Sequence, residues 1–101
     1  MTTIKKAQEE VADYDKKYGW DDDGAEYITI HMTEELGEIA RRILRHGGYK
    51  KERFDEKELA EEITDLLYLT LKLANKFGID VEKEWDGDMW CRYEKKVNRL
   101  K

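Results

Sequence analysis

Two short acidic runs in the sequence have a spacing that suits metal binding. The first contains Glu35 and Glu38. The second starts at Glu61, with 22 residues between it and Glu38, and contains Glu62 and Asp65. Glu35 with Glu38, and Glu62 with Asp65, are spaced i, i+3, so on α-helices each pair projects from one side, its members about 60° apart. Four carboxylates from two neighbouring helices could therefore converge. An all-oxygen cluster suits Mg²⁺, with Mn²⁺ as a second choice.

These acids lie beside the apolar stripes of their segments. By helical angle, Glu35 is about 65° from the centre of its stripe and Glu62 about 60° from the centre of its own. Clustered carboxylates at the edge of a core repel one another unless a cation compensates them. No Glu-x-x-His spacing accompanies the acids, which disfavours zinc and iron. The alternative interpretation is a solvated acidic face whose first-turn acids stabilise a helix dipole, and spacing alone leaves both open.

Helices must position these acids, because proline is absent and the seven glycines fall mostly where one periodic segment ends. The third segment starts at a capping box, in which Asp55 accepts from the N–H of Glu58. The pattern predicts an all-α, four-helix bundle-like module with two long motif helices, forming one domain over residues 1–101. The expected helices run from the Thr3 cap to Gly19, from about Ala25 to Gly47, from Asp55 to Gly78, and from Asp80 to Leu100 with a weak point at Gly87.

Composition excludes several classes of protein. The 101 residues carry 19 Lys and Arg against 24 Asp and Glu, a net charge of −5, which argues against a nucleic-acid polymer as partner. No apolar run approaches the roughly 20 residues that a membrane span needs. Cys91 is the only cysteine, so no internal disulfide forms and we expect a cytoplasmic protein. Residues 66–74 are apolar nearly all round, which predicts a homodimer or a dimer of dimers.

The two acidic motifs together resemble the MazG-like family of all-α nucleoside triphosphate pyrophosphohydrolases. The segment YGWD at 18–21 is similar to the aromatic segment that precedes the family's first motif helix, and MTEELGEI at 32–39 is similar to that helix. The run DLLYL at 65–69 resembles the continuation of the second motif helix, and LANKFGID at 73–80 resembles its end and turn. The resemblance covers most of residues 18–100.

This resemblance implies a magnesium-dependent hydrolase that cleaves a nucleotide substrate, a (d)NTP, to the monophosphate and pyrophosphate. It implies Glu35, Glu38, Glu62 and Asp65 as the metal ligands. The carboxylate that takes the proton from the attacking water stays open among Glu35, Glu38 and Glu61.

Further residues are candidates for substrate binding. The segment from Arg92 to Lys96 resembles the family's basic segment, which contacts substrate phosphates, although Trp90 stands where the family often has asparagine. The same cations would also stabilise a helix C-terminus. Trp20 and Tyr27 could stack on a base or plug the core, and His31, one turn before Glu35, could touch the nucleotide or be a boundary residue. The basic residues that share one helical face are Arg92, Lys95, Lys96 and Arg99.

Two rival functions remain open at the level of sequence. The first is phosphoribosyl-ATP pyrophosphohydrolase, an enzyme of histidine synthesis whose fold and acidic motifs this sequence also resembles. A helical dimerisation or regulatory module without activity would carry the same acids as a solvated face. The base and sugar of the substrate are not predicted.

Overall fold

The computed structural model describes residues 1–48 and 53–100, and in these two ranges the regular secondary structure is helical throughout. The all-α prediction, with four helical segments of which two are long, is confirmed. No helix among these residues is long and apolar enough to cross a membrane. The elements are α1 (Ile4–Tyr18), η1 (Trp20–Asp22), α2 (Ala25–His46), α3 (Glu56–Lys76), α4 (Val81–Lys83), η2 (Glu84–Met89) and α5 (Trp90–Leu100).

Local signals set most of the helix ends. The Thr3 hydroxyl accepts from the Lys6 N–H at 3.1 Å, and Gly19 ends α1 in the left-handed region at φ 73°. Asp80 caps α4 by accepting from the Lys83 N–H at 3.1 Å. Each of these ends agrees with the sequence-based prediction.

The start of α3 differs from the predicted capping box. Asp55 does cap the helix, but its Oδ1 accepts from the Lys57 N–H at 2.9 Å instead of from Glu58. The Glu58 carboxylate forms an ion pair with Arg42 of α2. A contact between helices therefore takes the place of the local contact that the sequence pattern indicates.

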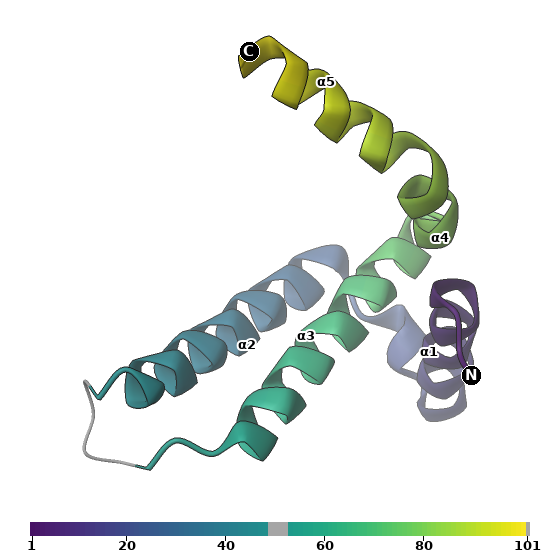
Figure 1. The fold of residues 1–101 in the computed structure, drawn as a ribbon. Helices are drawn as coiled ribbons and strands as arrows, with labels where there is room; N and C mark the ends of the chain where they lie inside the picture. The colour runs from purple at the N-terminus through teal and green to yellow at the C-terminus, as the bar shows by residue number, and fades with distance from the viewer. Residues whose placement is uncertain (49–52, 101) are drawn as a thin grey trace.

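The helices α2 and α3 form an antiparallel pair, and α1 packs against α3 near its C-terminal half (Figure 1). The buried apolar residues lie where these three helices meet, and α3 supplies more of them than α1 or α2, as its sequence predicts. They are Val11, Ile28, Leu69, Leu71 and Ala74. Burial of these side chains is the main force that holds α2 and α3 face to face.

A buried polar network ties α1 and the start of α2 to α3. The ammonium of Lys72 lies 2.7 Å from Asp23 Oδ2 and 3.9 Å from Asp15 Oδ2. The Tyr68 hydroxyl donates to the Asp15 carboxylate, and burial with this contact raises the pKa of Tyr68. Because Lys72 is largely buried, its two acidic partners are needed to compensate its charge.

The C-terminal segment leaves the body of the molecule. The helical segments α4, η2 and α5 follow one another directly, and η2 is a π-helix that includes Gly87, the predicted weak point. In Figure 1, α5 extends away from the α2–α3 pair. Its large apolar side chains stay exposed within one chain, Trp90, Tyr93 and Val97 among them. Helices α1, α2 and α3 thus form the packed body, α4 contacts α1, and α5 projects away from them.

Candidate functional site

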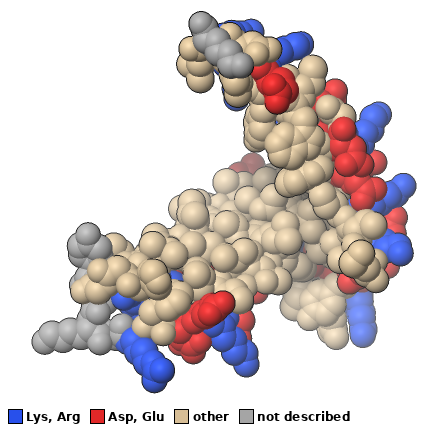
Figure 2. Space-filling model, in the orientation of Figure 1, with Lys and Arg blue, Asp and Glu red and all other residues tan. Residues whose placement is uncertain are grey.

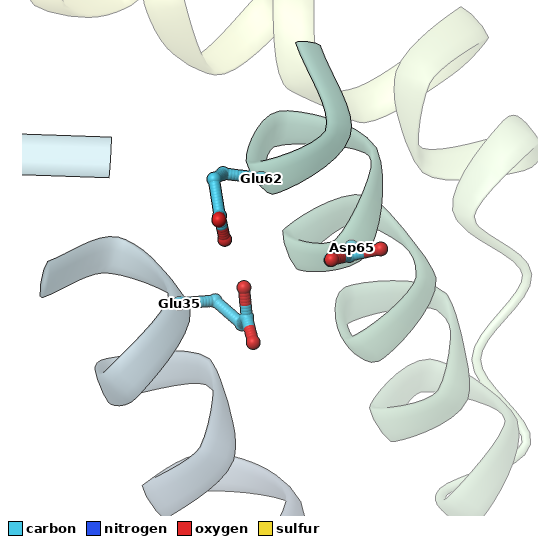
Figure 3. Close-up of side chains that lie close together, drawn as sticks. All are labelled: Glu35, Glu62 and Asp65. Atoms are coloured by element: carbon cyan, nitrogen blue, oxygen red, sulfur yellow. The ribbon is translucent and has the colours of Figure 1, made fainter. Parts of the chain in front are cut away.

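Three of the acidic side chains singled out in the sequence meet between α2 and α3. Glu35 from α2 and Glu62 from α3 point toward each other, and Asp65 lies one turn further along α3 (Figure 3). One carboxylate oxygen from each of the three lies within 4.8 Å of the other two. The i, i+3 spacing on α3 produces this arrangement, since it puts Glu62 and Asp65 on the side that faces α2.

The carboxylates of this cluster repel one another, and the effect is strongest at Glu35. The pKa of Glu35 is raised from 4.5 to about 7, first by a hydrogen bond with Glu62 that requires a proton, then by burial and by the charges of Glu62, Asp65 and Glu38. In addition, Glu35 Oε2 is buried and has no hydrogen-bond partner among residues 1–48 and 53–100. A divalent cation would satisfy this orphaned oxygen and relieve the repulsion, and an all-carboxylate donor set fits Mg²⁺ or Mn²⁺.

Glu38 and Glu61 are not part of this three-carboxylate group. Glu38 lies one turn beyond Glu35 on α2, half-exposed, and its Oε2 forms an ion pair with Arg41. Its charge still raises the pKa of Glu35. Glu61 is exposed on α3. The structure therefore brings together three of the four predicted ligands, with Glu38 beside them.

An aromatic pocket lies one turn away from the carboxylates. It has a volume of about 400 Å³. His31 connects pocket and cluster, since its Nε2 lies 3.7 Å from Glu35 Oε1. Trp20 lines the pocket and also packs on Tyr14 and Tyr18, with ring centroids at 5.7 and 5.3 Å. It is 45% exposed, so it does not plug the core, and its stacking on a base stays a prediction. The lining residues are Trp20, Asp23, Tyr27, Ile28, His31, Tyr68, Leu69 and Lys72.

The basic stripe, which consists of Arg92, Lys95, Lys96 and Arg99, does not lie beside the carboxylate cluster. All its members are exposed on α5, which extends away from α2 and α3 (Figure 1). Arg92 lies 4.0 Å from Glu84, and the ammonium of Lys96 lies over the Tyr93 ring at 5.8 Å. Within one chain, the direction of α5 keeps Arg92, Lys95, Lys96 and Arg99 apart from the carboxylates.

Sequence reasoning missed two buried cations of this region. Arg42 of α2 contacts Glu58 and Glu62 of α3, and Lys72 forms part of the pocket wall. A signal for Arg42 was present, because it follows Glu35 by seven residues and so lies two turns along the same side of α2. The sequence offered no comparable signal for Lys72.

Among the described residues the fold is helical, and acidic side chains of two long helices face each other, in agreement with the MazG-like all-α nucleoside triphosphate pyrophosphohydrolases that the sequence resembles. Comparison with family models gives the closer assignment, since the model described as phosphoribosyl-ATP pyrophosphohydrolase matches residues 2–87. The chain belongs to this family, which supports an activity of the nucleotide pyrophosphohydrolase type. The matched range contains all the cluster and pocket residues, and it ends before the basic stripe.

One curated relative supports the assignment. The uncharacterized protein YpjD of Bacillus subtilis (strain 168) is 34% identical over 79 residues, which cover 66% of this chain and 71% of the relative. No solved structure matches the chain.

Proposed function

We propose that the protein hydrolyses a nucleoside triphosphate to the monophosphate and pyrophosphate, with Mg²⁺ held by Glu35, Glu62 and Asp65. The observation that carries this proposal is the convergence of the three carboxylates in a chain of this family. One of their oxygens, Glu35 Oε2, is buried with no hydrogen-bond partner in the described part of the chain. Mn²⁺ has the same preference for oxygen ligands and is expected to replace Mg²⁺.

A divalent ion held by these carboxylates would supply positive charge that offsets the charge of phosphate oxygens and makes a water molecule more acidic. Of the three acids considered as the base, Glu35 belongs to the ligand group and Glu61 is exposed on α3. Glu38 lies beside the cluster, close enough for its charge to raise the pKa of Glu35. We therefore assign to a Glu38 carboxylate oxygen the role of accepting the proton of the attacking water.

The aromatic pocket is the proposed site for the nucleoside. Trp20 and Tyr27 offer ring faces on which a base can stack, and stacking tolerates different bases. His31 lies between this pocket and Glu35, so it would contact the sugar or the α-phosphate of a nucleotide that spans both. The triphosphate would then reach the carboxylates while the base stays in the pocket.

The basic stripe requires a second copy of the chain in this proposal. The exposed apolar side chains of α5 would be buried if α5 packed on another protomer, and the same holds for Ile63 and Leu67 of α3. The face that Figure 2 presents over α2 and α3 carries few charged groups, as an interface requires. In a homodimer or a dimer of dimers, Arg92, Lys95, Lys96 and Arg99 would contact the phosphates bound to the partner.

The test is pyrophosphate release from a panel of canonical and modified (d)NTPs and from phosphoribosyl-ATP, with Mg²⁺ or Mn²⁺ and with chelator. We expect metal-dependent release from a (d)NTP. The description of the matching family makes phosphoribosyl-ATP the second candidate substrate. Pyrophosphate release from that compound alone would show that it, and not a (d)NTP, is the substrate. Absence of any release, together with no thermal shift on adding metal, would support a non-enzymatic helical module.

A further inference from the structure

Arg42 connects the two acidic helices at the carboxylate cluster. Only 13% of its side chain is exposed. From α2 its Nη1 forms an ion pair with Glu58 Oε2, and its Nη2 lies 3.4 Å from Glu62 Oε1. Both acids belong to α3, one turn apart, so the guanidinium spans them as a fork.

A buried cation beside a metal site needs a reason, because its charge repels the metal. Glu58 lies outside the three-carboxylate group, and its charge offsets that of the guanidinium. Arg42 contacts only one oxygen of Glu62, Oε1, in the ion pair. The second carboxylate oxygen of Glu62 can therefore coordinate a metal ion. A guanidinium that fixes one oxygen of a ligand carboxylate restricts the rotation of the whole group.

We propose that Arg42 is a positioning residue, which holds Glu62 Oε1 so that the other oxygen of Glu62 faces Glu35 and the divalent cation. This inference rests on the proposed metal site. Glu58 completes the arrangement by anchoring the far side of the guanidinium. Lysine cannot replace arginine here, since a single ammonium lacks the planar fork that reaches both acids.

The positioning role and a simple charge effect predict opposite changes in metal affinity when Arg42 is removed. If Arg42 acted only through its charge, its removal would relieve repulsion and tighten metal binding. If it positions Glu62, its removal weakens metal binding by about 10- to 100-fold, the range typical of groups that orient metal ligands.

The experiment measures Mn²⁺ binding to the full chain by electron paramagnetic resonance of the free ion, without substrate. The variants are Arg42→Gln, Arg42→Lys and the control Lys57→Gln, which removes one positive charge at an exposed position of α3. Helix content by circular dichroism shows which variants fold, and Arg42→Lys keeps the charge should Arg42→Gln fail to fold. We expect both Arg42 variants to bind Mn²⁺ more weakly and Lys57→Gln to bind as the wild type does.

Unchanged or tighter binding in the folded Arg42 variants would overturn the positioning role. The variant Glu35→Gln separates this failure from failure of the proposed function. If the wild type binds Mn²⁺ and Glu35→Gln does not, the metal site stands whatever Arg42 does. If the wild type itself fails to bind, the metal site and the role of Arg42 fall together.

Discussion

Glu35 on α2 and Glu62 on α3 face each other across the helix pair, and their contact is the largest of the causes that raise the pKa of Glu35 to about 7. Near neutral pH the metal-free cluster therefore retains a proton more readily than an isolated glutamate does. A divalent cation has to displace that proton. In the proposed site, metal binding and proton binding would therefore compete at Glu35.

The affinity for metal is expected to fall as the pH decreases below 7. Because the proton on Glu35 competes with the ion, Mn²⁺ binding should weaken about tenfold for each pH unit below 7 and level off above it. Calorimetry between pH 5.5 and 8 measures the affinity, and repeating the titration in two buffers of different ionisation enthalpy counts the protons released. Affinity that stays constant over this range would contradict the assignment of Glu35 as a ligand.

The stability of the metal-free protein should depend on pH in the opposite direction. The folded-state pKa of Glu35 is about 7 and its ordinary value is 4.5, so the folded state binds the proton more tightly than the unfolded state does. This contribution to stability is fully present below pH 4.5 and is lost as the pH rises through 7. Urea unfolding with chelator should give a lower midpoint at pH 7.5 than at pH 5, and Glu35→Gln should reduce the difference.

Asp65→Ala is expected to abolish activity while the fold survives. Asp65 is exposed and adds no buried apolar area, so its loss costs little stability, but it removes one of three ligand carboxylates. We expect pyrophosphate release to fall by at least about 100-fold, on the scale of losing one electrostatic group of a catalytic site. Steady-state kinetics and thermal unfolding measure the two effects, with exposed Thr64→Ala as the control. Full activity in Asp65→Ala would refute the site.

Trp20→Ala tests the nucleoside pocket. Stacking of one base on an aromatic side chain is worth about 1–3 kcal/mol, so the KM should rise about 5- to 150-fold. Trp20→Phe keeps a ring face and should recover most of this loss. Trp20→Ala also removes the ring contacts with Tyr14 and Tyr18, so thermal unfolding of both variants measures the loss of packing separately from the change in KM. Equal KM values in wild type and Trp20→Ala would place the base elsewhere.

The sequence predicted those features whose causes are local. The apolar spacing predicted the helices, and the N-caps Thr3 and Asp80 predicted where two of them begin. Each of these signals depends on residues only a few positions away. The acidic pair Glu62 and Asp65 was found for the same reason, since i, i+3 spacing on a helix fixes a common face.

Features that depend on distant parts of the chain were not predicted. Lys72 sits in an apolar run, and its partner Asp23 lies 49 residues earlier, so only the packed structure reveals the pair. Glu58 binds Arg42 on the neighbouring helix in place of the local cap. The direction of α5 follows from the π-helix η2, for which Gly87 gave only a weak signal.

The most direct test of the metal site is the anomalous diffraction of crystals soaked in Mn²⁺. We expect one strong peak between α2 and α3, at about 2.0–2.2 Å from carboxylate oxygens of Glu35, Glu62 and Asp65, as hard-cation coordination requires. A peak bound by other residues, or no peak at a saturating concentration of Mn²⁺, would contradict the account.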